Sequence, residues 1–177
     1  MSKIKLIIDV VMFFVTFFLM DVNFISPLWH EIFGITISFL IIIHLILNFK
    51  WLKNITKNFK RVNKYTKILY GIDLLTFLSY FTTIIVGILI STSIFNFKTS
   101  YNPYLMLTHH ITGRLSLSFM LIHLGFHLER IINKITKNET IRISIYIIYS
   151  TLSFLVTIYL IYKLVNSYVW QGVVRYN

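Results

Sequence analysis

The sequence predicts an all-α integral membrane protein, organised as a four-helix bundle from a duplicated two-helix unit and followed by a fifth transmembrane helix. Three observations support this prediction. Hydrophobic residues make up 56% and charged residues only 13% of the 177 positions, outside the range of soluble domains. The apolar runs are long enough to cross a bilayer, and one histidine spacing occurs twice. We expect residues 1–177 to form a single transmembrane domain.

The composition also narrows the possible chemistry. Because the chain has no cysteine, thiolate-ligated iron–sulfur clusters, c-type haem attachment and disulfides are excluded, and histidine is left as the main soft ligand. The formal net charge of +11 does not indicate nucleic acid, because the basic residues cluster beside the predicted membrane ends. Membrane lipid is therefore the expected partner, and nucleic acid is not.

The first helix is predicted at about residues 4–22, where an apolar run follows Lys3 and Lys5. No small-residue cleavage site follows the run, so we interpret it as a retained helix rather than a signal peptide. Asp9 lies one or two turns inside this helix, where a lone carboxylate is costly. We expect Asp9, and its repeat counterpart Asp73, to pair with a basic loop or to help a proton reach a quinone site.

The second helix is predicted at about residues 28–50, after a short turn that contains Pro27. A basic loop without acidic residues follows, with Lys53, Lys57, Lys60, Arg61, Lys64 and Lys67. Such a run is typical of a cytoplasmic loop, and docking to anionic lipid or an acidic partner is the alternative.

The third helix, predicted at about residues 68–94, reveals a repeat. Its start, KILYGIDLLTFLSYF, aligns with KIKLIIDVVMFFVTF at the first helix, so that Asp73 matches Asp9. The fourth helix is predicted at about residues 105–130, and the fifth, which has no histidine, at about residues 141–165.

The distribution of lysine and arginine predicts the orientation. Thirteen of these residues lie at the amino terminus and in the two basic loops, whereas the opposite side holds only Lys98, Lys163 and Arg175. This places the amino terminus in the cytoplasm and the carboxyl terminus outside, in a multi-pass protein of the cell membrane. The second and fourth helices then run parallel to each other.

Four histidines share one spacing. His30 and His44 are fourteen residues apart in the second helix, and His109 and His123 are fourteen residues apart in the fourth. Fourteen residues make nearly four helical turns, so each pair lies on one face, about 21 Å apart along the axis. Parallel helices therefore bring His30 beside His109 near the outer face, and His44 beside His123 nearer the cytoplasm.

A haem iron with two axial imidazoles needs two histidines that face each other, and in a helical bundle neighbouring helices supply them. The matched spacing meets this need at two depths. We therefore predict that the axial metal ligands of two b-type haems are His30, His44, His109 and His123. A set of buried histidines bonded to neighbouring backbone is the alternative.

Two glycines and a second histidine belong to the predicted cofactor site. Gly34 and Gly113 each follow an outer histidine by four residues, where a missing side chain leaves room for a ring edge or for close helix packing. His110 could replace its neighbour His109 as the ligand, although the repeat favours His109.

Arg114 and His127 complete the predicted site. Arg114, about one turn after His109, is expected to meet a haem propionate or to reach the outer interface. His127, one turn after His123, is expected to meet a propionate, a quinone or water, or to be a plain interfacial histidine.

Two motifs stand out as a set: HEIFG followed by HLILNFKW, from His30 to Trp51, and HLGFH, from His123 to His127. They resemble the flavinylation-associated membrane cytochrome family, and the resemblance covers about Trp29 to Arg130. It implies a b-type cytochrome whose haem core is similar to that of ferric reductases and respiratory cytochromes b. The four histidines at the shared spacing would be its axial ligands. Arg114 departs from the aromatic residue that the family often has after the outer histidine of the fourth helix.

The resemblance implies electron transfer across the membrane, often to an extracytoplasmic flavin-carrying protein. We predict that electrons enter near His44 and His123, from quinol or a cytoplasmic donor, and leave near His30 and His109. The chain is an oxidoreductase subunit if it also oxidises quinol, and the sequence points to no such site. The alternatives are a metal-ion transporter that uses the histidines as zinc or copper relays, and a haem-containing membrane anchor subunit of a partner oxidoreductase.

Overall fold

The computed structural model describes residues 3–20, 25–98 and 102–174, and its regular structure there is entirely helical. Five helices follow one another along the chain: α1 (Lys3–Phe18), α2 (Pro27–Lys57), α3 (Lys64–Leu89), α4 (Pro103–Ile135) and α5 (Glu139–Val174). The predicted all-α class is confirmed, since no strand occurs in the part of the chain that the structure describes.

Asparagine side chains cap the starts of α3 and α4. Asn63 accepts a hydrogen bond from the backbone N–H of Thr66, and Asn102 accepts from those of Tyr104 and Leu105. These bonds satisfy backbone donors that have no partner within the first helical turn. The local sequence therefore determines where these two helices begin.

Several helices extend beyond the predicted apolar runs. α2 continues past Lys50 to Lys57, α3 begins at Lys64, and α4 reaches Ile135, so parts of the predicted basic loops are helical. Lysine has a high helix propensity, and Lys57 in the last turn of α2 interacts favourably with the negative end of the helix dipole. The predicted end of the first helix, at residue 22, lies outside the described residues.

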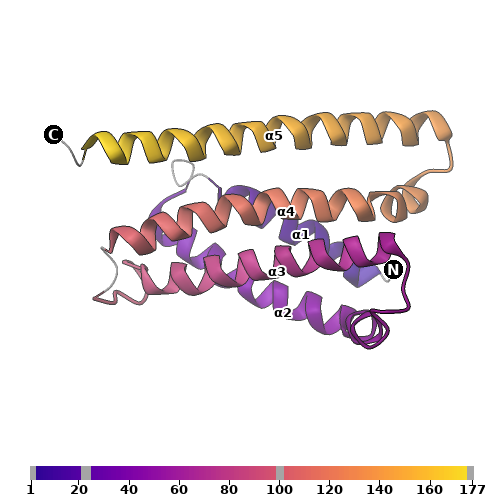
Figure 1. The fold of residues 1–177 in the computed structure, drawn as a ribbon, viewed down its shortest axis with the longest axis horizontal. Helices are drawn as coiled ribbons and strands as arrows, with labels where there is room; N and C mark the ends of the chain where they lie inside the picture. Colours follow the sequence, from indigo (N-terminus) through magenta and orange to yellow (C-terminus); the bar gives the residue numbers. More distant parts are fainter. Residues whose placement is uncertain (1–2, 21–24, 99–101, 175–177) are drawn as a thin grey trace.

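Consecutive helices run in opposite directions along the long axis of the molecule, so α2 and α4 run in the same direction (Figure 1). α1 packs beside α2, α3 beside α4 and α5 beside α4, with a smaller contact between α2 and α3. Each predicted two-helix unit is thus a packed pair. Among the described residues, α2 and α4 are not a closely packed pair, so the two helices with matched histidines stand apart.

Among the residues that the structure describes, three helices are long and apolar enough to cross a membrane: α2, α3 and residues Glu139–Lys163 of α5. α1 has 16 residues, fewer than the roughly 20 that span a bilayer, and α4 is interrupted by histidines, threonines and Arg114. By length and composition, three of the five predicted spans are therefore supported.

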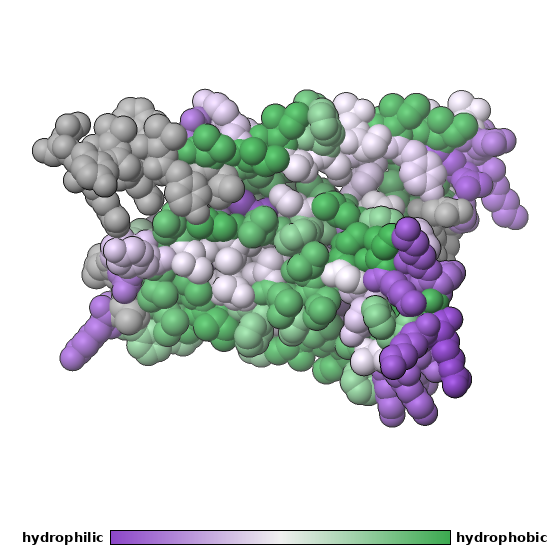
Figure 2. Space-filling model, viewed as in Figure 1, coloured by the Kyte–Doolittle hydropathy of each residue, from purple (hydrophilic) through white to green (hydrophobic). Residues whose placement is uncertain are grey.

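The surface is divided along the long axis. On the face shown in Figure 2, apolar side chains predominate in the middle, and hydrophilic residues gather at the end that holds the amino terminus and the connection from α2 to α3 in Figure 1. We call this end the basic end, after the lysines and arginines between Lys53 and Lys67, and the opposite end the far end. A lipid bilayer around the middle would match this distribution.

Polar contacts join α1, α3 and α4 in the interior. The Thr16 and Tyr80 hydroxyls are 2.7 Å apart, and the Tyr80 hydroxyl donates to Met120 Sδ at 3.4 Å. The Thr83 and Ser116 hydroxyls are 3.2 Å apart. In a membrane the hydrophobic effect does not drive helices together, because lipid tails are as apolar as the helix surfaces. Hydrogen bonds between helices therefore contribute to their association. These contacts fix the height of α4, which carries His109 and His123, relative to α1 and α3.

Candidate metal centres

Two pairs of histidine rings meet between α2 and α4. The ring centres of His44 and His123 are 6.5 Å apart, with 72° between the ring planes. Those of His30 and His109 are 6.0 Å apart, with 73° between the planes. We call these the basic-end pair and the far-end pair, after the end of the molecule that each lies nearer. The structure thus brings together the residues that share one spacing in the sequence.

The two ring distances fit imidazoles that bind one metal ion between them. With metal–nitrogen bonds of about 2 Å, the two ring centres lie roughly 6 Å apart. The steep angle between the ring planes is compatible with axial ligation, because each ring can rotate about its own metal–nitrogen bond. A haem also needs space between the helices that hold it, and α2 and α4 are not closely packed where the structure describes them.

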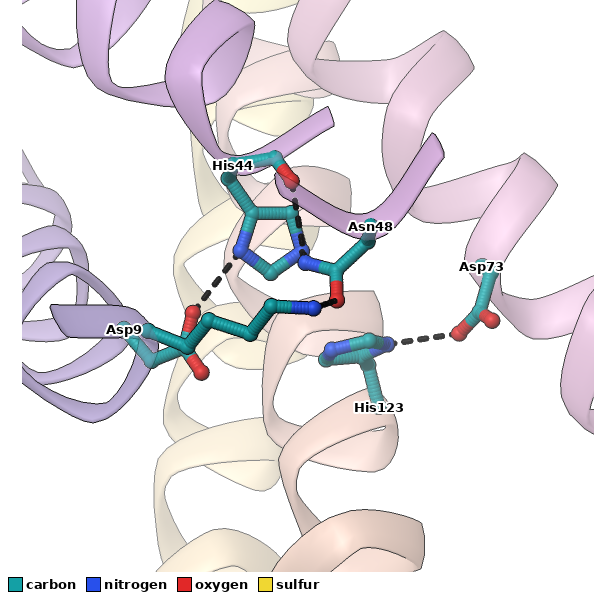
Figure 3. Close-up of polar contacts among 6 residues, drawn as sticks. Asp9, His44, Asn48, Asp73 and His123 are labelled. Atoms are coloured by element: carbon teal, nitrogen blue, oxygen red, sulfur yellow. Dashed lines mark hydrogen bonds and ion pairs between the residues drawn. The ribbon is translucent and has the colours of Figure 1, made fainter. Parts of the chain in front are cut away.

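At the basic-end pair, a carboxylate from a neighbouring helix holds each ring (Figure 3). Asp9 Oδ1 of α1 lies 2.7 Å from His44 Nδ1, and Asp73 Oδ1 of α3 lies 2.6 Å from His123 Nδ1. An ionised carboxylate only accepts hydrogen bonds, so each Nδ1 donates its proton and each Nε2 keeps its lone pair for a metal. This arrangement is typical of histidine ligands in metal sites.

These contacts correct the prediction that Asp9 and Asp73 pair with a basic loop. Both side chains are partly buried, with 27% and 17% of their area exposed, and both bond a histidine instead. The physical reason is the pairing of the helices. α1 packs beside α2 and α3 beside α4, so each aspartate faces the histidine of its own two-helix unit.

Asn48 is a further polar neighbour of His44 (Figure 3). Its side-chain nitrogen lies 3.3 Å from His44 Nε2, and its Oδ1 accepts a hydrogen bond from Lys5 Nζ at 3.0 Å. The amide thus occupies the lone pair that a metal would take and must turn away when a metal binds. Asn48 stands one turn after His44, as His127 stands one turn after His123.

At the far-end pair, the ring contacts are different. His109 Nδ1 lies 3.0 Å from the backbone carbonyl oxygen of Thr83, which is an acceptor, so Nδ1 carries the proton here too. His30 Nδ1 is buried and has no hydrogen-bond partner within residues 3–20, 25–98 and 102–174. In the part of the chain that the structure describes, neither ring bonds a carboxylate, and the Nε2 lone pair of His109 is available to a metal.

Gly87 makes the contact between His109 and α3 possible. A Cβ atom at this position would stand 2.9 Å from His109 Cε1 and 3.2 Å from His109 Nδ1, closer than side chains normally approach. The ring therefore rests on bare backbone. Sequence reasoning missed both Gly87 and Thr83, because a carbonyl acceptor has no sequence signal and the repeat has Asn23, not glycine, at the position that matches Gly87.

The two predicted glycines lie in different surroundings. A Cβ atom at Gly34 would meet nothing within 4 Å, which leaves open space beside the far-end pair. One at Gly113 would make an ordinary contact with Thr83 Cγ2 at 3.7 Å. Gly113 therefore faces α3, as close helix packing predicts, and Gly34 is the position where a ring edge has room.

His110 and Arg114 lie beside the far-end pair without joining it. The His110 ring is exposed, and its centre is 6.2 Å from that of His109. Arg114 is partly buried one turn further along α4. Of the two adjacent histidines, His109 is the one whose ring meets His30, at 6.0 Å.

His127 extends the basic-end pair. Its ring centre is 4.6 Å from that of His123, and the ligand atoms of Asp73, His123 and His127 all lie within 4.8 Å of one another. Three such groups can hold a transition-metal ion, so this triad is a second way in which the basic end can bind metal.

Glu31 ties the α3–α4 connection to α2 next to His30. Its carboxylate accepts hydrogen bonds from the Ser91 hydroxyl and from the backbone N–H groups of Thr92, Ser93 and Ile94. These bonds explain why α3 ends at Leu89, before the predicted end at residue 94. The N–H groups of residues 92–94 donate to Glu31 instead of to backbone carbonyls one turn earlier. The motif HEIFG contained this residue, but its partner was visible only in the structure.

The two pairs therefore offer two metal sites, each with one histidine from α2 and one from α4. In three of the four rings Nδ1 is bonded, which leaves Nε2 as the ligand atom. Such sites can bind haem iron for electron transfer or a free metal ion for transport. Comparison of the chain with protein-family models, curated proteins and solved structures gives no match.

Proposed function

We propose that this chain is a dihaem b-type cytochrome that transfers electrons across a membrane. The proposal rests on the two histidine pairs, with 6.0 and 6.5 Å between ring centres, at two levels of the same parallel helices. Ionisable side chains inside a membrane are costly, and they usually have a functional partner. Two bis-histidine haems provide such a partner for all four rings.

The four matched histidines would be the axial ligands: His30, His44, His109 and His123. Bound haem supplies a one-electron redox couple. The chain's own groups orient the rings, through two carboxylates at the basic end and a backbone carbonyl at the far end. His109 is preferred to His110 because its ring is the one that meets His30.

The basic end would face the cytoplasm, because lysine and arginine mark cytoplasmic ends of membrane helices. In this orientation, electrons pass from quinol or a cytoplasmic donor to an extracytoplasmic acceptor such as a flavin-carrying protein. The chain then works as the electron-transfer subunit of an oxidoreductase. Membrane lipid surrounds the apolar middle seen in Figure 2.

The test is an absorption spectrum of the chain purified from haem-replete membranes. We expect a Soret band that sharpens and shifts on reduction with dithionite, and two haems per chain by pyridine haemochrome assay. A colourless protein would refute the proposal. One haem per chain would support the alternative of an anchor subunit that holds a single haem.

A second candidate function is histidine-dependent metal-ion transport. The cluster of Asp73, His123 and His127 favours it, because its ligand atoms lie within 4.8 Å of one another and include an anionic oxygen. Zinc binding to the haem-free chain distinguishes the two functions. Transport predicts stoichiometric zinc that is lost in His127→Ala, together with metal flux into proteoliposomes, whereas a cytochrome shows haem and no flux.

A further inference from the structure

The two histidine pairs differ in what accepts the Nδ1 proton. At the basic-end pair, both acceptors are carboxylate oxygens, at 2.7 Å for His44 and 2.6 Å for His123. At the far-end pair, the acceptor for His109 is a neutral carbonyl at 3.0 Å, and buried His30 Nδ1 has no acceptor among the described residues. Two carboxylates therefore bond the rings of the basic-end pair, and within the described ranges none bonds those of the far-end pair.

Charge on a ligand histidine affects the metal that the histidine binds. A carboxylate that accepts the Nδ1 proton makes the imidazole more basic, so Nε2 donates more electron density to the metal. The oxidised metal carries one more positive charge than the reduced metal and gains more from this donation. Second-shell hydrogen bonding is thus one of the means by which a protein sets a haem potential.

Other charged groups near the rings do not reverse this difference. Glu31, next to His30 at the far end, acts on that ring only through space, because its carboxylate bonds the Ser91 hydroxyl and the backbone N–H groups of Thr92, Ser93 and Ile94. Arg114, also near the far end, is a cation and favours the reduced metal there. Lys5 at the basic end donates to Asn48, and its positive charge offsets part of the aspartate charge.

We infer that Asp9 and Asp73 lower the reduction potential of the basic-end haem below that of the far-end haem. The inference rests on the proposed function and deepens it, because it gives the chain a direction. With haem bound at both pairs, this difference would favour transfer of one electron from the basic end to the far end, with iron oxidised from Fe(II) to Fe(III) at the first and reduced from Fe(III) to Fe(II) at the second. No bond forms or breaks, and quinol or another cytoplasmic donor replaces the electron.

The experiment is a redox titration of the purified holoprotein followed by absorption. His30→Ala retains only the basic-end haem and His44→Ala only the far-end haem, which assigns the two potentials. We expect the basic-end potential to be lower by at least 59 mV, a tenfold preference for the electron at the far end in a one-electron couple. Equal potentials, or the reverse order, overturn the inference while the haems themselves still support the proposed function.

Two substitutions then test the cause. Asp9→Asn and Asp73→Asn keep the size of the side chain and remove its charge, and we expect each to raise the basic-end potential and leave the far-end potential unchanged. Glu31→Gln is the matched control, because its carboxylate touches neither ring of the basic-end pair, and it should leave the basic-end potential unchanged. No shift in either aspartate variant overturns the inference.

If an asparagine variant loses its haem, the corresponding Asp→Glu variant retains the charge and provides a second measurement. The longer carboxylate should keep the basic-end potential low. If the basic-end potential in Asp73→Glu rises to the far-end value, the result contradicts the role of charge. A wild-type protein with no haem overturns the inference together with the proposed function.

Discussion

The basic-end and far-end pairs have nearly the same ring separation, 6.5 and 6.0 Å, but are held in different ways. At the basic end, each two-helix unit contributes the same device, an aspartate on the first helix bonded to a histidine on the second. At the far end, the His109 ring contacts the backbone at Gly87, and His30 Nδ1 has no hydrogen-bond partner among the residues that the structure describes. Both two-helix units thus supply a histidine at each end. Only at the basic end do the two units also supply the same hydrogen-bond acceptor for it.

The divergence between the units lies next to the ligands. Glu31 follows His30 in the first unit, and His110 stands at the matching position in the second. Glu31 holds the α3–α4 connection, whereas His110 is exposed. Residues that follow matched histidines can therefore have different roles although the histidines occupy equivalent positions, because neighbours on a helix point in different directions.

The largest expected effect comes from removing the ligands themselves. His30→Ala and His44→Ala should each lose one of the two haems, and the double variant should lose both, because a single imidazole leaves the iron with an open position. Haem-to-protein ratio by pyridine haemochrome assay measures this. His110→Ala is the control and should retain both haems; loss of the far-end haem in that variant would assign the ligand to His110 instead.

Gly87→Ala should disturb the far-end pair alone. The new Cβ atom would stand 2.9 Å from His109 Cε1, so the ring must move away from the Thr83 carbonyl, at a cost of about 1–3 kcal/mol that is typical of overpacking. We expect reduced far-end haem occupancy with the basic-end haem retained. Gly71→Ala is the matched control, since nothing lies within 4 Å of its Cβ. Equal haem content in the two variants would contradict a close contact between position 87 and the His109 ring.

Asp73→Ala should weaken the basic-end haem without removing it. The variant leaves His123 Nδ1 without its acceptor, and losing such a partner typically lowers metal affinity by about 10- to 100-fold. Transfer of haem to an excess of a haem-scavenging protein measures the dissociation rate at each site. The effect should be confined to the basic end, and faster release from the far-end site would show that Asp73 acts on the whole bundle.

The smallest expected effect is at Glu31. Glu31→Gln removes the charge that accepts from Thr92, Ser93 and Ile94, with an expected cost of about 1 kcal/mol because the group is close to solvent. Hydrogen exchange at these three amides should accelerate while both haems remain. Glu139→Gln, at the exposed start of α5, is the control and should leave the same amides protected.

Periodicity and composition predicted much of the fold. The apolar runs indicated five helices, and the fourteen-residue step placed His30 with His44, and His109 with His123, on shared faces. These predictions were possible because helical periodicity depends only on positions along one chain segment. The ends of the helices were less accurate, since the caps at Asn63 and Asn102 and the lysine-rich turns extend the helices beyond their apolar runs.

The sequence by itself determined an all-helical chain and four histidines in register on two helices. Only the tertiary structure decided that Asp9 and Asp73 bond the basic-end rings, that Gly87 receives His109, and that Glu31 ends α3. Each of these contacts joins segments that are distant in the sequence, and it depends on the relative rotation and height of the helices to within an ångström or so. No single segment encodes those quantities, because they result from the packing of all the helices together.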